Sequence, residues 1–228
     1  GDTLTVGSDI AGILENFQLE GTLRILQEPE DCGDDRGAIR ESDLRVLFNA
    51  SLNGYIEPCG CVVGKTGGVD RIVERIDRHR AEHPHTIFLE GGDLFAEDPL
   101  LPANQRDQLG LKADAMFGLW QRAGCRAMGL GDLDLQLGVR ELQRLAAEYE
   151  IPILCANLVD GRDEFVFERS VIVERDGVRI GIFGLLSQNL VHPDIEDDSV
   201  IRVGQFVEEL GLRLLPWRAV AQRMVTEL

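Results

Sequence analysis

The feature that most constrains the fold is a regular alternation of short apolar runs with longer segments of helical period, which begins near residue 43. The apolar runs are bounded by Gly, Asn or Asp, as buried strands are, whereas a segment such as "GGVDRIVERIDRHRAEH" places Val69, Ile72 and Ile76 on one helical face. Strands are predicted at residues 44–50, 85–93, 126–132 and 151–158, and helices at residues 67–83, 109–124 and 138–150. Such alternation predicts an α/β fold with a mostly parallel sheet.

The two ends of the chain depart from this alternation. Residues 165–177 and 178–186 are two strand-like segments joined by Arg-Asp-Gly, which predicts an antiparallel β-hairpin. Residues 1–42 have short apolar stretches without a sustained period, so we interpret them as an N-terminal extension of a domain that spans residues 43–228. The chain begins with Gly rather than Met, and we expect a preceding segment to have been removed.

Charge and composition exclude several classes of partner. The net charge of -17 argues against a nucleic acid polymer or an anionic membrane, because both are bound by Lys and Arg. No apolar run reaches the roughly 20 residues of a transmembrane segment. Five cysteines leave at least one thiol free, bound to a ligand or bridged to another chain. Cys125 and Cys155 stand among apolar neighbours, which is typical of small buried residues.

Polar and glycine residues follow each predicted parallel strand. These strand ends are Asn49-Ala50-Ser51, Gly91-Gly92-Asp93, Gly131-Asp132 and Ala156-Asn157. In open α/β sheets, ligands bind outside the carboxyl ends of the strands. The sequence therefore predicts a ligand or metal site built from these strand ends.

The order of the strand ends resembles the calcineurin-like metallophosphoesterases, most closely a cysteine-bearing subgroup of the secreted 5'-nucleotidase branch. The resemblance covers residues 44–228 and depends on "FLEGGDLF", "ADAMFGLWQRAGCRAMGLGDLDLQLG", "IPILCANL" and "VRIGIFGLLS". It implies a layered metallophosphoesterase-like sandwich with a mostly parallel sheet and a hairpin. It also implies that this chain holds only the N-terminal part of the family domain, since the final helix precedes the segment that carries the family's remaining ligands.

The family hydrolyses phosphate esters with two divalent metals held by Asp, Asn and His. Carried over by position, Asp93 stands where the bridging carboxylate belongs, and Asp132 stands in place of a metal-binding Asn. Asn49 replaces the first Asp, Ser51 replaces its His, and Leu133 replaces the His that stabilises the leaving group. The resemblance thus implies a metal site, for Zn, Mn or Fe, from which most ligands have been lost.

The loop after the first strand carries Cys59-Gly60-Cys61. One interpretation is a thiolate metal or redox site, completed by Asp93, Asp132 or another cysteine. The alternatives are a disulfide that fixes the loop, or two thiols without chemistry. A tetrahedral zinc site needs four ligands, and this pair supplies two, so the sequence leaves these interpretations open.

Further candidates could bind an anion or another ligand. Gly67 and Gly68 start the first predicted helix, where backbone N–H groups can bind an anion, and Lys65 lies beside them. Tight packing between strand and helix is the alternative role for the glycines. Ser51 and Asn157 complete the candidate ligand-binding residues through their places at strand ends.

Two functional hypotheses follow from the resemblance. The first is a non-catalytic 5'-nucleotidase-like subunit or binding module of an exported complex, in the periplasm or outside the cell, with other protein subunits as partners. The second is a divergent metal-dependent phosphoesterase that uses Asp93, Asp132, Asn49, Cys59 and Cys61 as ligands and acts on nucleotides or related phosphate esters.

Overall fold

A computed structural model describes residues 44–57, 68–96, 106–175, 177–188, 191–193 and 200–228. Its centre is a parallel sheet of four strands in the order β1-β2-β3-β4. These strands are β1 (Arg45–Asn49), β2 (Thr86–Glu90), β3 (Cys125–Gly129) and β4 (Ile153–Leu154). The predicted α/β class with a mostly parallel sheet is confirmed.

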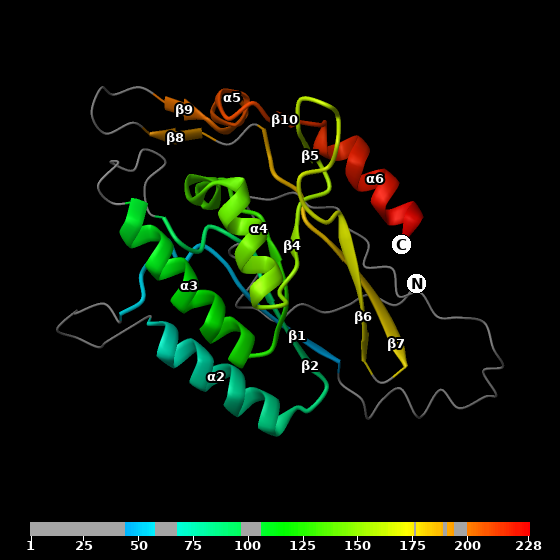
Figure 1. Ribbon diagram of the computed structural model, residues 1–228. Coiled ribbons are helices and arrows are strands. Elements are labelled where there is room, and N and C mark those ends of the chain that lie inside the picture. Colours follow the sequence, from blue (N-terminus) through cyan, green and yellow to red (C-terminus); the bar gives the residue numbers. More distant parts are fainter. Residues whose placement is uncertain (1–43, 58–67, 97–105, 176, 189–190, 194–199) are drawn as a thin grey trace.

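Three helices cover one side of this sheet, as Figure 1 shows. They are α2 (Val69–Glu82), α3 (Arg106–Arg122) and α4 (Val139–Glu148). Helix α3 has apolar residues at the i, i+3, i+4, i+7 spacing of a helix face that packs on a core, and all of them are buried. These residues are Ala113, Met116, Phe117 and Trp120. The Trp120 ring meets Phe88 of β2 edge-on, with centroids 5.4 Å apart, so α3 packs directly on the sheet.

The hairpin of β6 (Ser170–Arg175) and β7 (Val178–Phe183) lies on the other side of the sheet (Figure 1). Its antiparallel pairing confirms the prediction from Arg-Asp-Gly, although β6 begins at residue 170 rather than 165. Strand β7 contacts the residue that follows the C-terminal helix α6 (Trp217–Glu227), since a Cβ at Gly181 would lie 3.0 Å from the Leu228 side chain. The hairpin therefore contacts the C-terminal end of the chain, while most of its side chains stay partly or fully exposed.

The remaining elements are short. They are β5 (Leu158–Val159), β8 (Val191–Pro193), β9 (Val200–Arg202), α5 (Val203–Glu209) and β10 (Arg213–Leu214). Strand β5 pairs with β10, and β8 pairs with β9, both antiparallel. In the part of the chain that the structure describes, no helix is both long and apolar enough to cross a membrane.

The structure corrects the ends of three predicted strands, and one of them is β2, which ends at Glu90 rather than at residue 93. The single strand predicted at 151–158 is wrong: β4 ends at Leu154, and β5 belongs to a different pair of strands. The chain leaves the sheet because the N–H of Cys155 bonds to Glu168 and that of Ala156 bonds to Gly184, both outside the parallel sheet. Strand β3 ends at Gly129 rather than 132, and a short 3-10 helix (Leu133–Leu137) follows it.

Candidate functional site

Two carboxylates join the loops that follow β2 and β3. Asp134 is completely buried, and its Oδ2 accepts the N–H groups of Asp93 and Gly131, each at 2.9 Å. Its Oδ1 accepts the N–H of Leu94 at 2.8 Å. In return, Asp93 Oδ1 accepts the N–H of Leu133 at 3.0 Å. Each loop thus supplies a carboxylate that satisfies backbone donors of the other loop.

This exchange requires glycine at two positions. A Cβ on Gly131 would lie 2.1 Å from the nitrogen and 2.2 Å from Oδ1 of Asp93. A Cβ on Gly92 would lie 2.4 Å from the nitrogen of Gly131, and the φ of Gly92 is +99°. Asp93 itself has a φ of 54°, a left-handed conformation that Asp and Asn tolerate better than most residues.

A third buried carboxyl group, Glu90 at the end of β2, links β1 to α3. Its Oε2 accepts Nδ2 of Asn49 and Nε1 of Trp120, each at 2.8 Å. Its Oε1 accepts the N–H groups of Gly91 at 3.1 Å and Gly92 at 3.2 Å. We call Asn49, Glu90, Asp93 and Asp134 the strand-end cluster, because each stands in or just after the end of β1, β2 or β3.

Burial raises the pKa of two cluster members. Burial raises the pKa of Glu90 to about 7, against the opposing effect of its four hydrogen-bond donors. Burial, with a smaller contribution from the charge of Asp93, raises the pKa of Asp134 to about 8. The three backbone N–H donors stabilise the charged carboxylate and so oppose this rise in pKa, but burial has the larger effect.

The structure places four of the predicted site residues at adjacent strand ends. Asn49 donates to Glu90, and Ser51 is exposed, with its N–H bonded to the carbonyl of Gly92 at 2.9 Å. Asp132 is buried, and its carbonyl accepts the N–H of Leu135 in the 3-10 helix. Together with Asp93, these residues lie at or just after the carboxyl ends of β1, β2 and β3. Their roles as metal or anion ligands stay predictions.

Asn157 and Gly68 lie elsewhere and have structural partners. The buried Asn157 amide donates to the carbonyls of Leu186 and Leu215 and accepts the N–H of Leu186. Gly68 precedes α2 with a φ of 93°, and its carbonyl accepts the N–H of Ile72. Their ligand-binding roles stay predictions.

The predicted cysteine loop is not placed by the structure. Cys59, Cys61, Lys65 and Gly67 lie outside the described residues. Cys125 and Cys155 are buried with free thiols, as predicted. Burial raises the pKa of the Cys125 thiol to about 12 and that of Cys155 to about 11, which keeps both protonated at neutral pH.

The described residues alone do not fit a metal centre. Within that part of the chain, no three His, Cys, Asp or Glu side chains are grouped so that they could hold a metal ion. The first strand end contributes a neutral amide from Asn49 and a hydroxyl from Ser51, which are weak substitutes for carboxylate and imidazole ligands. Asp93 already accepts a backbone N–H through Oδ1.

Sequence reasoning missed Glu90 and Asp134, the two most deeply buried acids of the cluster. The signal for Glu90 was a charged residue at the last position of an otherwise apolar strand, "TIFLE". An unpaired carboxylate there would be costly, so partners had to be near. The signal for Asp134 was weaker, because it lies in the apolar "LDLQL", whose 3-10 conformation was not predicted.

Some known proteins are similar to this chain in sequence or in fold. No family model matches the sequence. Over 147 residues, 63% of this chain, the sequence is 30% identical to a "Probable 5'-nucleotidase" of Treponema pallidum (strain Nichols), of which it spans only 23%.

Solved structures extend the match to about 80% of this chain. A 5'-nucleotidase precursor from Thermus thermophilus matches 80% of this chain and 34% of its own, with a TM-score of 0.59 and 24% identity. The calcineurin-like phosphoesterase YfkN from Bacillus subtilis matches 81% of this chain and 57% of its own, with a TM-score of 0.60 and 16% identity. The chain therefore has, in part, the α/β fold of 5'-nucleotidases and calcineurin-like phosphoesterases.

Proposed function

We propose that this chain is a non-catalytic binding module with a 5'-nucleotidase-like fold, and that it serves as a subunit of an exported protein complex. The observation that carries the proposal is the hydrogen bond from Asn49 to Glu90. At the end of β1, the neutral amide of Asn49 donates to the buried carboxyl group of Glu90 on the neighbouring strand β2. The first strand end thus contributes to packing instead of presenting an anionic ligand.

The residue at position 133 supports the same proposal. Leu133 is only 5% exposed, and its side chain can neither donate nor accept a hydrogen bond. The resemblance puts it where the family has a histidine that stabilises the leaving group. With Leu133 there and Ser51 on the first strand end, the cluster lacks the imidazoles that phosphate ester hydrolysis in this family uses.

We place the protein outside the cytoplasm, in the periplasm or beyond, with protein partners. The placement follows the resemblance to the secreted 5'-nucleotidase branch. The strong negative charge of -17 favours partners with basic surfaces over nucleic acids.

A divergent phosphoesterase is the competing function, and two observations favour it. Asp93 and Asp132 stand at adjacent strand ends, and the relative from Treponema pallidum is named a probable 5'-nucleotidase. In that case Cys59 and Cys61 would contribute ligands for Zn, Mn or Fe.

Phosphate release separates the two functions. The purified chain is incubated with nucleoside monophosphates and added Mn²⁺, Co²⁺ or Zn²⁺, beside an Asp93→Asn variant. Asn is the suitable replacement because it tolerates the φ of 54° at this position, and thermal unfolding checks that the variant is folded. We expect both proteins to release phosphate at the same background rate. Turnover by the parent that Asp93→Asn abolishes would overturn the non-catalytic function and establish the competing one.

A further inference from the structure

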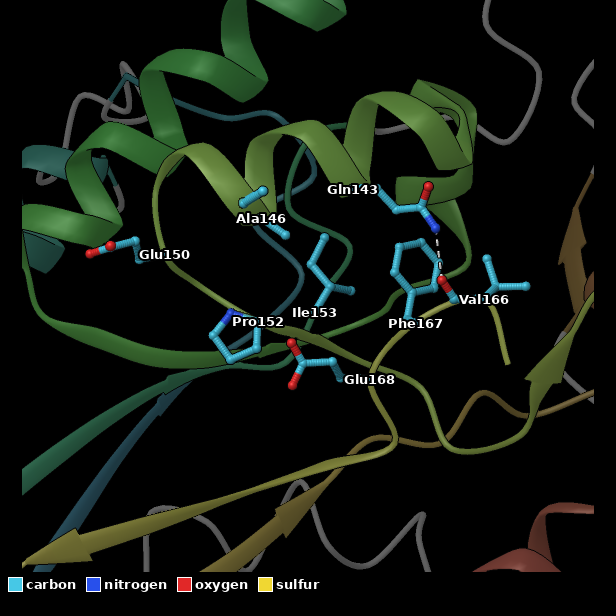
Figure 2. A pocket seen from close by; sticks show the side chains of 9 residues that line it. Gln143, Ala146, Glu150, Pro152, Ile153, Val166, Phe167 and Glu168 are labelled. Atoms are coloured by element: carbon cyan, nitrogen blue, oxygen red, sulfur yellow. Dashed lines mark hydrogen bonds between the residues drawn. The ribbon is translucent and has the colours of Figure 1, made fainter. Parts of the chain in front are cut away.

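A groove lies beside the start of β4, which is the edge strand of the sheet farthest from β1. Its volume is about 420 Å³. One wall is the C-terminal half of α4 with Ala146, the floor is Ile153 of β4, and the other wall is Phe167. Figure 2 shows these apolar side chains between α4 and the 166–168 segment, with Glu168 beside Pro152.

The walls of the groove are fixed by hydrogen bonds. Gln143 Nε2 of α4 donates to the carbonyl of Val166 at 2.9 Å, across the groove (Figure 2). The carbonyl of Glu168 accepts the N–H of Cys155 at 2.9 Å, next to β4. The N–H of Val166 bonds to the carbonyl of Leu158 at 3.2 Å. The 166–168 segment is therefore held to both α4 and the β4 region, so a ligand would meet a preformed groove.

The polar groups of the groove are negative. Glu168 and Glu150 line it, and both residues are exposed. Helix α4 ends at Glu148, so the negative end of its dipole lies on the same side. Glu150 stands farther out, past the end of α4 (Figure 2). An apolar floor with acid at its rim favours a ligand that has an apolar stem and a cationic head.

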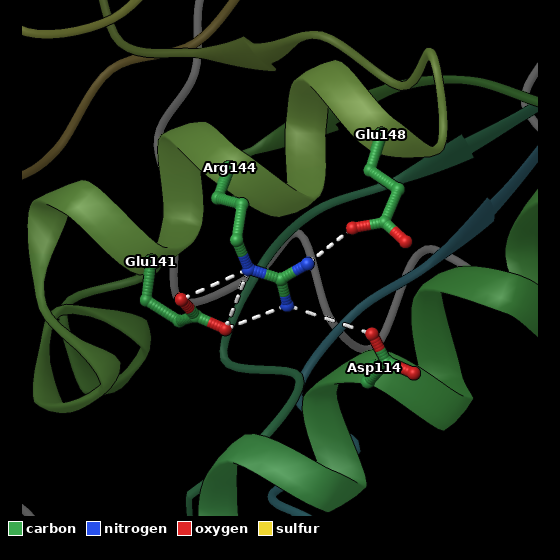
Figure 3. A network of polar contacts seen from close by, with 4 residues as sticks. All are labelled: Asp114, Glu141, Arg144 and Glu148. Atoms are coloured by element: carbon green, nitrogen blue, oxygen red, sulfur yellow. Dashed lines mark hydrogen bonds and ion pairs between the residues drawn. The ribbon is translucent and has the colours of Figure 1, made fainter.

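The arginines nearest in sequence are bonded to other groups. Arg144 of α4 binds Glu141, Glu148 and Asp114, on the side of the helix that faces α3 (Figure 3). Arg169 pairs with Glu227, and its guanidinium lies over the Phe165 ring at 5.2 Å from the centroid. The described residues that line the groove include no Lys or Arg, so they supply no cation for its negative groups.

We propose that this groove is a docking site for an arginine side chain of a partner protein. The three-carbon stem would lie along the partly exposed Ala146 and Val166, above Ile153 and Phe167, as long charged side chains cover apolar surface. The guanidinium would bind the Glu168 carboxylate, a pairing that planar arginine makes with two hydrogen bonds and lysine cannot. The docking site specifies which partner side chain the proposed binding module would contact. It rests on the proposed function only in that the partner is a protein.

The test is an NMR titration of the whole, ¹⁵N-labelled chain with the peptide acetyl-Gly-Arg-Gly-amide. We expect chemical shift changes that centre on the amides of Ala146, Ile153 and Phe167, with a dissociation constant on the order of 1 mM. The matching norleucine peptide, which keeps the apolar stem without the charge, should shift these amides far less.

Matched variants test the role of Glu168. Glu168→Gln should weaken binding of the arginine peptide at least about fivefold, as expected for loss of a charge-assisted hydrogen bond. Glu208→Gln removes the same charge from an exposed site on α5 and should leave the affinity unchanged. Scattered shifts, equal binding of the norleucine peptide, or unchanged affinity in Glu168→Gln would each overturn the docking site. None of these outcomes affects the phosphate-release result, which tests the proposed function separately.

Discussion

The strand-end cluster and the ion pairs around Arg144 are two groups of charged residues held in different ways. Arg144 forms ion pairs with three acids on α3 and α4, as Figure 3 shows, but its side chain is 45% exposed. Asp134, by contrast, is completely buried and accepts three backbone N–H groups. Burial, rather than the number of opposite charges, determines how much each contact contributes to stability.

The largest effect is expected from Asp134→Ala. The substitution leaves the buried N–H groups of Leu94 and Gly131 and the partly buried N–H of Asp93 without their acceptor, which should lower the free energy of unfolding by about 3–5 kcal/mol. Urea unfolding followed by circular dichroism measures it. The same change at Asp114, whose side chain is half-exposed, is the control and should cost less than about 1 kcal/mol. Equal urea midpoints for the two variants would contradict the comparison.

A smaller effect is expected from pH, through Glu90. The pKa of Glu90 is raised from 4.5 to about 7 in the folded state, so between these pH values the folded protein holds a proton that the unfolded chain has released. The free energy of unfolding should therefore fall as the pH rises from about 4.5 to about 7.

The isosteric variant Glu90→Gln isolates this contribution. The Gln side chain cannot ionise, so the variant lacks the pH-dependent loss that Glu90 causes. Over the same pH range, the free energy of unfolding of the parent should fall by up to about 3 kcal/mol more than that of the variant, by linkage. Asp134, with its pKa raised to about 8, should cause most of the remaining slope. Urea midpoints at pH 5 and pH 8 give the comparison, and parallel pH profiles for the two proteins would show that Glu90 does not titrate as described.

The smallest effect is expected from Arg144→Met, which keeps an apolar stem but removes the ion pairs with Glu141, Glu148 and Asp114. Exposed pairs are weak and screened by salt. The thermal midpoint should change little in low salt and not at all in high salt, on the order of 1 M NaCl. A large loss that persists in high salt would mean that this surface network stabilises the protein as the buried cluster does.

The sequence predicted the elements that burial patterns control. The central strands and helices, the hairpin and the gathering of Asn49, Ser51, Asp93 and Asp132 at the carboxyl ends of the strands all followed from apolar periodicity and from the geometry of parallel sheets. Cys125 and Cys155 were likewise predicted to be buried from their apolar neighbours.

Contacts between loops distant in sequence could not be predicted in the same way. Asp134 binds backbone groups 40 and 41 residues away, and nothing in "LDLQL" identifies those partners. The end of β4 was misplaced for a similar reason. Residues 155 and 156 are apolar enough to continue a strand, but their N–H groups bond to Glu168 and Gly184, which a local pattern does not reveal.

The close approach of Gly92 and Gly131 also determines which positions at the carboxyl ends of the strands can be varied in protein engineering. A library that aims to build a metal centre into the fold would have to keep both glycines, because a single methyl group at either would force the two loops apart. Ser51 is exposed, and Asn49 lies at the end of β1, the first strand in the sheet order. The positions to vary are therefore 49, 51 and 133, while Gly92 and Gly131 stay fixed because the two loops can approach this closely only without side chains there.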